Sequence, residues 1–367
     1  MKVLDFMNRH EDWEDLLTRP PYNIIVKHDG DYILLKYSQF NSDFNNEIVR
    51  ECRGAIFYKL PYNVGYICVC RAFDKFGNYG EDYVKDVDWN SIVVEEKVDG
   101  SLIKLWHHNN NWHISTNGTI DAFKANIDGT PYNFGGLVYE ALGGEEKFRE
   151  FTHLLDKRCT YMFELVSPKS RVTIFYPETK LYYLGQRNRI SMREMKLCND
   201  FMYDFGVMTV KCYNLHSLDD CLEYVKTMTK DEEGFVIRDG NFNRMKLKSP
   251  EYLFAFHCNN NGAITTGRII DMIKEEKIDD FLAYCPQYTD HVNKVINAIG
   301  SLEFKLKMEW LYVEKYAECD RKEFANRVSK SQYKDFLFKK YSNHNLTVYD
   351  YIISKPTSKI KEMIEVE

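Results

Sequence analysis

The 367-residue chain lacks any apolar run near the ~18 residues that a membrane-spanning helix needs. Its first residues, Met1-Lys2-Val3-Leu4-Asp5, also lack the apolar core of a signal peptide. We therefore expect a soluble, intracellular protein with no membrane partner. Its place would be the cytoplasm, or the host cytoplasm if the source is a virus.

Cysteine patterns typical of metal sites are absent as well. The ten cysteines are scattered from Cys52 to Cys319, without a Cys-x-x-Cys pair or a His/Cys cluster of zinc spacing. The single close pair, Cys68 and Cys70, should lie on one face of a strand. Buried free thiols in a reducing compartment are the expected state.

A strong charge of one sign is missing too. The net charge of −6 gives no overall attraction to a polyanion, so any contact with nucleic acid must come from a local patch. No internal repeat or low-complexity linker is visible. What the chain has in plenty is aromatic residues, 26 Tyr and 23 Phe, which favours a folded, strand-rich protein.

The order of sequence patterns predicts an α+β fold with two domains. A short helix is expected over residues 4–17, then strands with turns from about 22 to 250, including 23–26, 32–37, 55–58 and 66–70. Helical insertions are expected over 137–155 and 192–205. A further helix over 218–228 would have Ser217 as its N-cap.

Beyond about residue 255 the apolar residues recur at helical spacing. Four stretches show it: 267–283, 290–318, 321–341 and 347–365. One apolar set is Ile269, Ile270 and Ile273, and another is Phe304, Met308, Leu311 and Tyr312. We therefore predict a domain of antiparallel sheets with helical insertions over residues 1–255, followed by an all-α domain over residues 256–367.

The most informative motif is Lys97-Val98-Asp99-Gly100-Ser101. Lys97 ends a predicted strand, and the Asp-Gly turn leads into a second apolar strand over 102–106. An amine in this position can attack phosphorus if desolvation or a neighbouring cation lowers its pKa. The alternative is an ordinary hairpin turn with a solvated lysine.

Four other segments add the remaining parts of a phosphoryl-transfer site. Glu164 interrupts an apolar strand over 160–166, and Glu233 precedes another over 234–237. Lys246 and Lys248, two residues apart, lie on the same face of a predicted strand, and Arg53 precedes another strand. A carboxylate within an apolar strand needs a partner or a metal. An exposed strand face, an edge salt bridge or a capped turn would explain each segment alone, but together they are what nucleotidyl transfer requires.

These segments, in this order, resemble the covalent nucleotidyltransferase superfamily of polynucleotide ligases and mRNA capping enzymes. The closer resemblance is to the RNA ligase 1 family typified by the T-even phage enzyme, and it spans about residues 50–255. The stretches that carry it are Glu51-Cys52-Arg53-Gly54, residues 71–76 from Arg71 to Phe76, Phe163-Glu164 through Pro168 with Arg171, and Lys246-Leu247-Lys248-Ser249 with Tyr252.

The resemblance implies an ATP-dependent RNA ligase for RNA break repair, with Mg²⁺, or Mn²⁺ in its place. Lys97 would form lysyl-AMP, and a hydrated metal ion would be positioned by Asp99, Glu164 and Glu233. Glu164 could instead hold the ribose, and Phe76 would stack near the adenosine or simply pack in the core. The ATP or phosphate contacts implied are Arg53, Lys75, Glu164, Arg187, Lys246 and Lys248.

The chain departs from the family pattern after the strand that follows Lys97. Where the phage enzyme has Ser-Lys-Gly-Ser, this chain reads Ser115-Thr116-Asn117-Gly118-Thr119. Asn117 can donate a hydrogen bond but carries no charge. We keep Asn117 as a candidate RNA contact and expect activity to survive.

The helical tail contains a basic stretch over residues 320–340. Its candidate RNA contacts are Arg321, Lys322, Arg327 and Lys330, and interleaved aromatics could stack on bases. The alternative is that these charges face water and the aromatics form the helix core. In the resembling family a C-terminal helical domain biases the enzyme towards tRNA-like substrates, so tRNA is the candidate RNA.

The expected substrate is RNA with 5′-phosphate and 3′-hydroxyl ends. No kinase or phosphatase motif is visible, which suggests a partner enzyme that heals the ends first. A capping guanylyltransferase or a DNA ligase would share the core motifs, but both normally continue into a small β-barrel. A catalytically silent RNA-binding protein is the alternative from another class.

Overall fold

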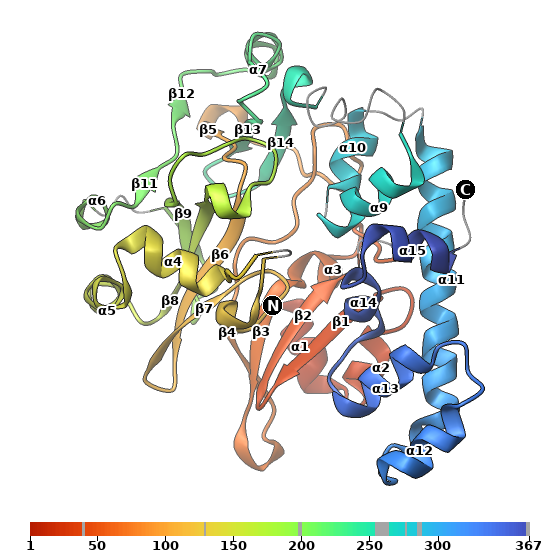
Figure 1. Cartoon of the computed structure of the whole chain (residues 1–367). Helices are drawn as coiled ribbons and strands as arrows, with labels where there is room; N and C mark the ends of the chain where they lie inside the picture. Colours follow the sequence, from red (N-terminus) through yellow and green to blue (C-terminus); the bar gives the residue numbers. More distant parts are fainter. Residues whose placement is uncertain are drawn as a thin grey trace. The chain divides into compact units, whose positions relative to one another are not determined.

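The computed structural model describes residues 1–38, 41–127, 130–196, 200–253, 264–275, 277–284 and 288–364. The chain divides into two compact units, one of Met1–Tyr37 and Asp43–Gly262 and one of Ser38–Ser42 and Ala263–Glu367 (Figure 1). The first is mixed α and β and the second is helical, so the predicted fold class is confirmed. No helix in the described ranges is long and apolar enough to cross a membrane.

The first sheet is antiparallel, in the order β1-β2-β3-β4. Its strands are β1 (Ile24–Asp29), β2 (Tyr32–Tyr37), β3 (Arg53–Lys59) and β4 (Tyr66–Cys70), with η1 (Pro61–Asn63) between the last two. Short helices pack near it: α1 (Lys2–Arg9), α2 (Trp13–Leu17) and α3 (Glu47–Glu51). The single helix predicted over residues 4–17 is wrong, because His10 takes an extended conformation and ends α1.

Cys68 and Cys70 do not share one hydrophobic cluster. The register between β3 and β4 shifts at Ile56 and Phe57, which is the mark of a β-bulge. Cys68 joins the cluster under α1 and α2, whereas Cys70 joins the cluster around Trp106. The seven cysteines that the structure describes are all free thiols, as predicted, but burial is confirmed for only five of them, because Cys212 is exposed and Cys319 is half-buried.

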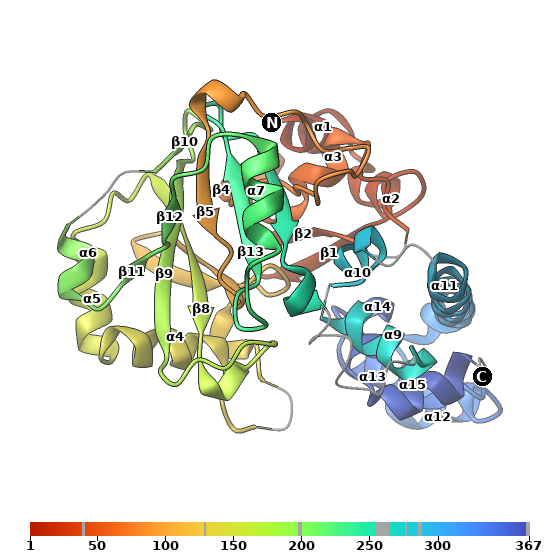
Figure 2. The same cartoon turned by 90° about the horizontal axis from the view of Figure 1, so that it is seen from above.

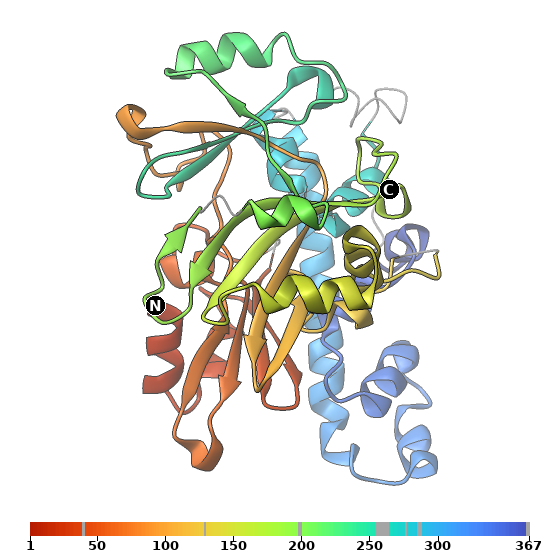
Figure 3. The ribbon, with the colours of Figure 1, turned by 90° about the vertical axis from the view of Figure 1, so that its left-hand side faces the viewer.

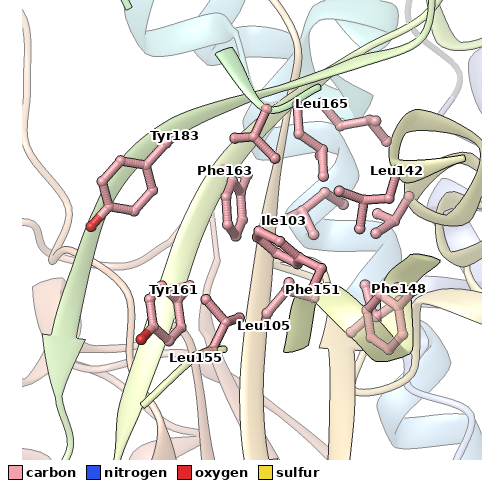
Figure 4. Packing of buried hydrophobic residues seen from close by; sticks show 14 of the residues in the cluster. Ile103, Leu105, Leu142, Phe148, Phe151, Leu155, Tyr161, Phe163, Leu165 and Tyr183 are labelled. Atoms are coloured by element: carbon pink, nitrogen blue, oxygen red, sulfur yellow. The ribbon is translucent and has the colours of Figure 1, made fainter. Parts of the chain in front are cut away.

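The central sheet has the order β10-β9-β8-β6-β7, and β11 pairs with β9. Its strands are β6 (Ser101–His108), β7 (Asn111–Ser115), β8 (Cys159–Val166), β9 (Lys180–Asn188), β10 (Glu194–Met195) and β11 (Met208–Thr209). One face packs under the helices α4 (Phe134–Leu142) and α5 (Glu145–His153). Figure 4 shows side chains of β6, β8 and β9 meeting those of the two helices.

Both helical insertions differ from prediction. The helix expected over 137–155 is broken by Gly143 and Gly144, whose φ angles of 91° and 113° are outside the helical range. In the segment 192–205, Glu194 and Met195 pair with β9, and α6 (Phe201–Asp204) is the only helix among its described residues. Residues 197–199 of that prediction lie outside the described residues. The short 3₁₀ turns η2 (Trp89–Ser91), η3 (Ala122–Lys124) and η4 (Pro168–Ser170) also belong to this unit.

The third sheet has the order β12-β5-β13-β14. Its strands are β12 (Cys212–Tyr213), β5 (Val93–Glu96), β13 (Gly234–Arg238) and β14 (Arg244–Lys248). Helix α7 (Leu218–Val225) covers one face, as Figures 2 and 3 show. The predicted cap is confirmed, because the Ser217 hydroxyl accepts the Asp220 backbone N–H at 3.1 Å.

The connection between β5 and β6 is not an ordinary hairpin, which was the alternative interpretation of the Asp-Gly sequence. β5 pairs with β12 and β13, whereas β6 pairs with β7 and β8. Residues 97–100 therefore carry the chain from one sheet to the other. This crossing places Lys97 between two sheets, where strands from both can reach it.

The second unit is built from helices in every part that the structure describes. They are α9 (Thr266–Lys274), α10 (Ile278–Tyr284), α11 (Thr289–Val313), η6 (Glu314–Tyr316), α12 (Arg321–Val328), α13 (Lys334–Ser342), α14 (Val348–Ile353) and α15 (Thr357–Ile364). Ile269, Ile270 and Ile273 are buried as predicted. The second apolar set is not core. On α11 the structure buries Leu302, Leu306 and Trp310 and exposes Phe304, Met308, Leu311 and Tyr312.

Candidate active site

Strand alternation separates the core from the candidate site. On β8 the side chains of Tyr161, Phe163 and Leu165 enter the hydrophobic core under α4 and α5. Glu164 therefore points to the opposite face of the sheet. On β14 Met245 and Leu247 pack under α7, so Lys246 and Lys248 point away from that helix. Each polar side chain is directed by its apolar neighbours in the same strand.

Lys97 and Lys248 share one carboxylate. The Lys97 backbone N–H donates to the Gly234 carbonyl oxygen at 2.9 Å, which holds the lysine beside the start of β13. Its Nζ lies 2.8 Å from Oε2 of Glu233, and Nζ of Lys248 lies 2.8 Å from Oε1. The side chains of Glu233 and Lys248 are each 1% exposed, whereas that of Lys97 is 21% exposed. The nucleophile candidate is thus the accessible member of a buried ion-pair triad.

The pKa of Glu164 reports which groups surround it. Burial raises this pKa to about 7, and the positive charges of Lys97 and Arg53 act in the opposite direction. The negative charges of Glu233 and Asp99 raise it further. Two further acids and two cations, predicted separately from the sequence, therefore lie close enough to Glu164 to shift its pKa.

Asp99 is held as an anchor of the neighbouring loop. Its Oδ2 accepts the backbone N–H groups of Thr173 and Ile174, both at 2.8 Å. Its Oδ1 accepts the Tyr252 hydroxyl at 3.1 Å. The Asp99 backbone N–H in turn donates to the Tyr176 hydroxyl at 3.3 Å. Both oxygens of Asp99 therefore anchor this loop, and its metal role stays a prediction.

The side chains of Arg53 and Lys246 lie against phenylalanine rings. The Arg53 guanidinium lies 5.2 Å from the Phe73 ring centre and 5.4 Å from that of Phe76. Lys246 Nζ lies 5.9 Å from the Phe76 centre. Phe73 and Phe76 also pack edge to face against each other, and Phe76 packs, partly buried, against a small cluster that includes Leu102 of β6 and Met162 of β8.

Lys75 and Arg187 line a cavity of about 120 Å³, together with Phe73, Phe76 and Arg244. Lys75 Nζ lies 4.7 Å from the Phe44 ring centre. Arg187 Nη2 lies 3.0 Å from Oε2 of Glu194, which also pairs with Arg244. In the register of the central sheet Arg187 pairs with Thr160 of β8, whereas Glu164 pairs with Tyr182.

Comparisons with known proteins decide the family. A family model described as RNA ligase matches residues 51–252. A protein of Autographa californica nuclear polyhedrosis virus, named as a candidate bifunctional polynucleotide kinase/RNA ligase, is 32% identical over 287 residues. The chain belongs to the RNA ligase family. An RNA ligase of Rhodothermus phage RM378 is 25% identical, with 86% of each chain covered.

The family match is uneven along the chain. The viral relative shares 73% of this chain, but the chain spans only 39% of that relative's length. A solved archaeal ATP-dependent RNA ligase (form 2) is 13% identical, with a TM-score of 0.45 over 77% of this chain and 75% of its own. The family match includes Lys97, Glu164, Glu233, Lys246 and Lys248, and it ends before the helical unit.

Within the RNA ligase family segment, Asn117 lies in the turn between β7 and η3. Its Oδ1 is buried and has no hydrogen-bond partner among the described residues. Its backbone touches Gly54, since a Cβ on that glycine would lie 2.5 Å from the Asn117 carbonyl oxygen. Asn117 is thus next to Arg53 in space.

The predicted RNA contacts of the tail lie on or beside α12, with their side chains exposed. Arg327 packs over the Tyr316 ring at 4.6 Å and forms an exposed pair with Glu323. The aromatics Phe324 and Phe336 are fully buried. The structure therefore supports the alternative for these rings, which form helix core and are not available for stacking on bases.

Sequence reasoning missed Arg244 and Glu194, which line the cavity beside Lys75 and Arg187, and it also missed Tyr176, which contacts Asp99. Arg244 precedes Lys246 by two residues, so the alternation on β14 already indicated that it shares their face. Glu194 was hidden by the mistaken helix over 192–205. Tyr176 lies in the connection between β8 and β9, far from Asp99 in the sequence, and no local pattern indicates their contact.

Proposed function

We propose that the chain is an ATP-dependent RNA ligase that joins RNA 5′-phosphate and 3′-hydroxyl ends through lysyl-AMP and RNA-adenylate. The carrying observation is Lys97, a partly exposed amine held by the buried Glu233–Lys248 pair beside Glu164, inside the segment that matches the RNA ligase family. These groups provide what attack on a phosphate needs. Lys97 is the amine, Glu233 carries the negative charge that holds it in place, and Lys248 is a cation for the negative charge that develops on the phosphate.

The first step forms a bond between Lys97 Nζ and the α-phosphorus of ATP, and the bond to pyrophosphate breaks. The ammonium form cannot attack, so Nζ must lose a proton. Glu233, 2.8 Å away, is placed to accept it. Lys246, Lys248 and Arg53 would stabilise the phosphoryl oxygens. AMP then passes to the RNA 5′-phosphate, and the 3′-hydroxyl displaces AMP to seal the strand.

The residues present fit a magnesium ion held largely through water, with manganese as the alternative. Within the described ranges, no three metal-ligating side chains gather at one point. Magnesium keeps several waters and usually takes one or two carboxylates together with substrate phosphates. Glu233 and Glu164 supply that number. When bound, the ion would neutralise phosphate charge and polarise the α-phosphoryl group.

The natural substrate is proposed to be broken RNA, with tRNA as the candidate. The viral relative's name joins ligase to polynucleotide kinase. We therefore propose that a separate kinase and phosphatase prepare the ends. Purified protein should seal 5′-phosphate and 3′-hydroxyl ends but not a 2′,3′-cyclic phosphate, and sealing of the cyclic end by this protein alone would contradict the proposal.

The direct test is intact-protein mass spectrometry after incubation with Mg²⁺ and either ATP or GTP. Wild type, stripped of bound AMP, should gain one AMP from ATP, and Lys97→Ala should gain none. The matched control is Lys211→Ala, which removes an exposed lysine near Tyr213 and should keep the adduct. Circular dichroism checks that Lys97→Ala is folded.

Each other outcome points to a rival. An AMP adduct on Lys97→Ala would refute the assigned nucleophile. A GMP adduct would favour a capping-type transferase, and no adduct with either nucleotide would favour the silent RNA-binding protein.

A further inference from the structure

A buried lysine on the first sheet lies next to the site and has no role in the chemistry described so far. Lys36 is near the end of β2, and its side chain is 8% exposed. The sheet register pairs Lys36 with Arg53 on β3, immediately after a bulge between Leu35 and Lys36. Like charges on directly paired residues repel each other. An anion bound here would interact favourably with both.

The same lysine faces the turn that contains Asn117. A Cβ built on Gly118 would lie 3.8 Å from Lys36 Nζ, so the ammonium group is directed at the backbone of this turn. Lys27 contacts the turn differently, because its Nζ donates to the Gly118 carbonyl oxygen at 2.8 Å. Lys27 therefore anchors the turn, whereas Lys36 brings a positive charge to it.

The Arg53 end of β3 is pressed against this turn. Gly54 has a φ of 67°, and a Cβ there would lie 2.5 Å from the Asn117 carbonyl oxygen. The fully buried Lys104 donates a hydrogen bond to the Gly54 carbonyl oxygen and so holds the first residues of β3 in place. Lys36, Arg53 and Asn117 are thus held together by backbone packing.

Two polar atoms at this junction are buried without a hydrogen-bond partner among the described residues. They are Nη1 of Arg53 and Oδ1 of Asn117. A buried polar atom without a partner costs free energy, so such atoms commonly mark a ligand position. The oxygen and nitrogen of an Asn amide are interchangeable by a flip, so Asn117 can also donate. A phosphoryl group, with several acceptor oxygens, would satisfy both side chains.

We propose that Lys36 supplies from β2 the positive charge that Asn117 lacks, and that Lys36, Arg53 and Asn117 together bind a phosphoryl group. This inference rests on the proposed ligase function and adds a phosphate-binding residue to it. The phosphoryl group belongs either to ATP or to the RNA 5′-phosphate. Both have the same chemistry, and the two half-reactions of the enzyme separate them.

The test compares Lys36→Met with Lys27→Met in the full chain. ATP dependence of AMP-adduct formation measures the first source, and AMP transfer from pre-adenylated enzyme to 5′-phosphate RNA measures the second. Lys36→Met should weaken at least one step about 10- to 100-fold, as expected for one charge-assisted hydrogen bond. Lys27→Met should lose less than about threefold, because the Lys27 ammonium donates to the Gly118 carbonyl oxygen and is not expected to contact the phosphoryl group.

The decisive variant restores the lost positive charge from the turn that contains Asn117 instead of from β2. Adding Asn117→Lys to Lys36→Met should recover most of the lost activity, because the ammonium group returns to the same junction. Lys36→Arg should retain activity. Equal losses in Lys36→Met and Lys27→Met, unchanged kinetics in Lys36→Met, or failure of the double variant to recover would each overturn the inference.

Two further controls keep the result interpretable. If thermal unfolding shows that Lys36→Met is not folded, Asn117→Asp is tested in its place. This variant leaves Lys36 intact and places a negative charge at the junction. It should weaken the same step, and unchanged kinetics would refute the inference. A wild type that forms no AMP adduct would refute the proposed function itself. A normal wild-type adduct together with an unaffected Lys36→Met would refute this inference alone.

Discussion

Glu164 lies where burial and charge act against each other, and its titration should be visible in the stability of the free protein. Its pKa is raised from 4.5 to about 7, chiefly by burial. Below pH 4.5 the group is protonated in both the folded and the unfolded chain. As the pH rises towards 7, the unfolded chain loses the proton first, so the free energy of unfolding falls across this window.

We predict that Glu164→Gln removes this pH dependence. The two proteins should have similar stability at pH 5, and the variant should be more stable by about 2 kcal/mol at pH 8, after allowance for solvent screening. Urea unfolding of both proteins at pH 5 and pH 8 measures this difference in the free energy of unfolding. Glu146→Gln, an exposed position on α5, is the control and should follow wild type. Parallel curves for wild type and Glu164→Gln would contradict the prediction.

Single residues were predictable where the chain itself shows a conflict. Glu164 stands out because a carboxylate is unexpected in an apolar strand, and Lys97 because an Asp-Gly turn follows it directly. Lys36 carries no such signal, since its importance depends on the register that pairs it with Arg53. Arg187 was placed with the nucleotide contacts only by resemblance, and the register of β9 carries it to the cavity beside Glu194.

At the scale of elements, the site depends on the close approach of β13 and β14. Gly234 follows Glu233 and has a φ of 136°, a conformation that other residues rarely adopt. A Cβ there would lie 2.7 Å from the Lys248 Cα and closer still to the Leu247 carbonyl oxygen. Any side chain at this position must push the two strands apart and separate Glu233 from Lys248.

We therefore predict that Gly234→Ala destabilises the protein by about 3 kcal/mol or more and abolishes AMP-adduct formation. Thermal unfolding and the mass-spectrometric assay measure the two effects. Gly30→Ala is the matched control, because Gly30 also has a positive φ, 61°, but no atom lies within 4 Å of a Cβ built there. It should cost about 1 kcal/mol and leave the adduct intact. A Gly234→Ala enzyme with normal adenylation would refute this account.

Elements were predicted well where alternation is local and poorly where the chain changes partners. The strands at 32–37, 66–70 and 244–248 follow from their own residues. The hairpin that was the alternative at Asp99-Gly100 does not form, and a turn sequence does not reveal which sheet its flanking strands join. The long predicted helices were broken at Gly143 and Gly144 and at His10, where the backbone leaves the helical range but the apolar spacing continues.

At the scale of the whole molecule, the sequence distinguished the mixed α and β unit from the helical unit. It did not show which faces of the helices in the second unit are buried. Residues Ser38–Ser42 join the helical unit, which no composition change near them indicates. On α11 two apolar stripes compete, and helical spacing alone could not show that Leu306 is buried and Leu311 exposed. The choice between them is made by the other helices that pack on α11.

The exposed cations of the helical unit allow adenylation and RNA binding to be separated. Arg321, Lys322, Arg327 and Lys330 are all exposed. If they bind RNA phosphates, changing all four to Gln should leave AMP-adduct formation unchanged and weaken RNA binding. The slope of log affinity against log salt should fall by about 0.7 to 0.9 for each phosphate that the protein no longer neutralises.

The matched control changes Lys305, Lys307, Lys359 and Lys361, which are equally exposed in the same unit, and so makes the same change in net charge. Fluorescence anisotropy with a labelled 5′-phosphate RNA at several salt concentrations measures affinity and slope. A selective loss in the first variant would make the surface around α12 the RNA-binding face. Equal losses in both variants would mean that overall charge, rather than this surface, governs RNA binding, and the predicted RNA contacts would then be wrong.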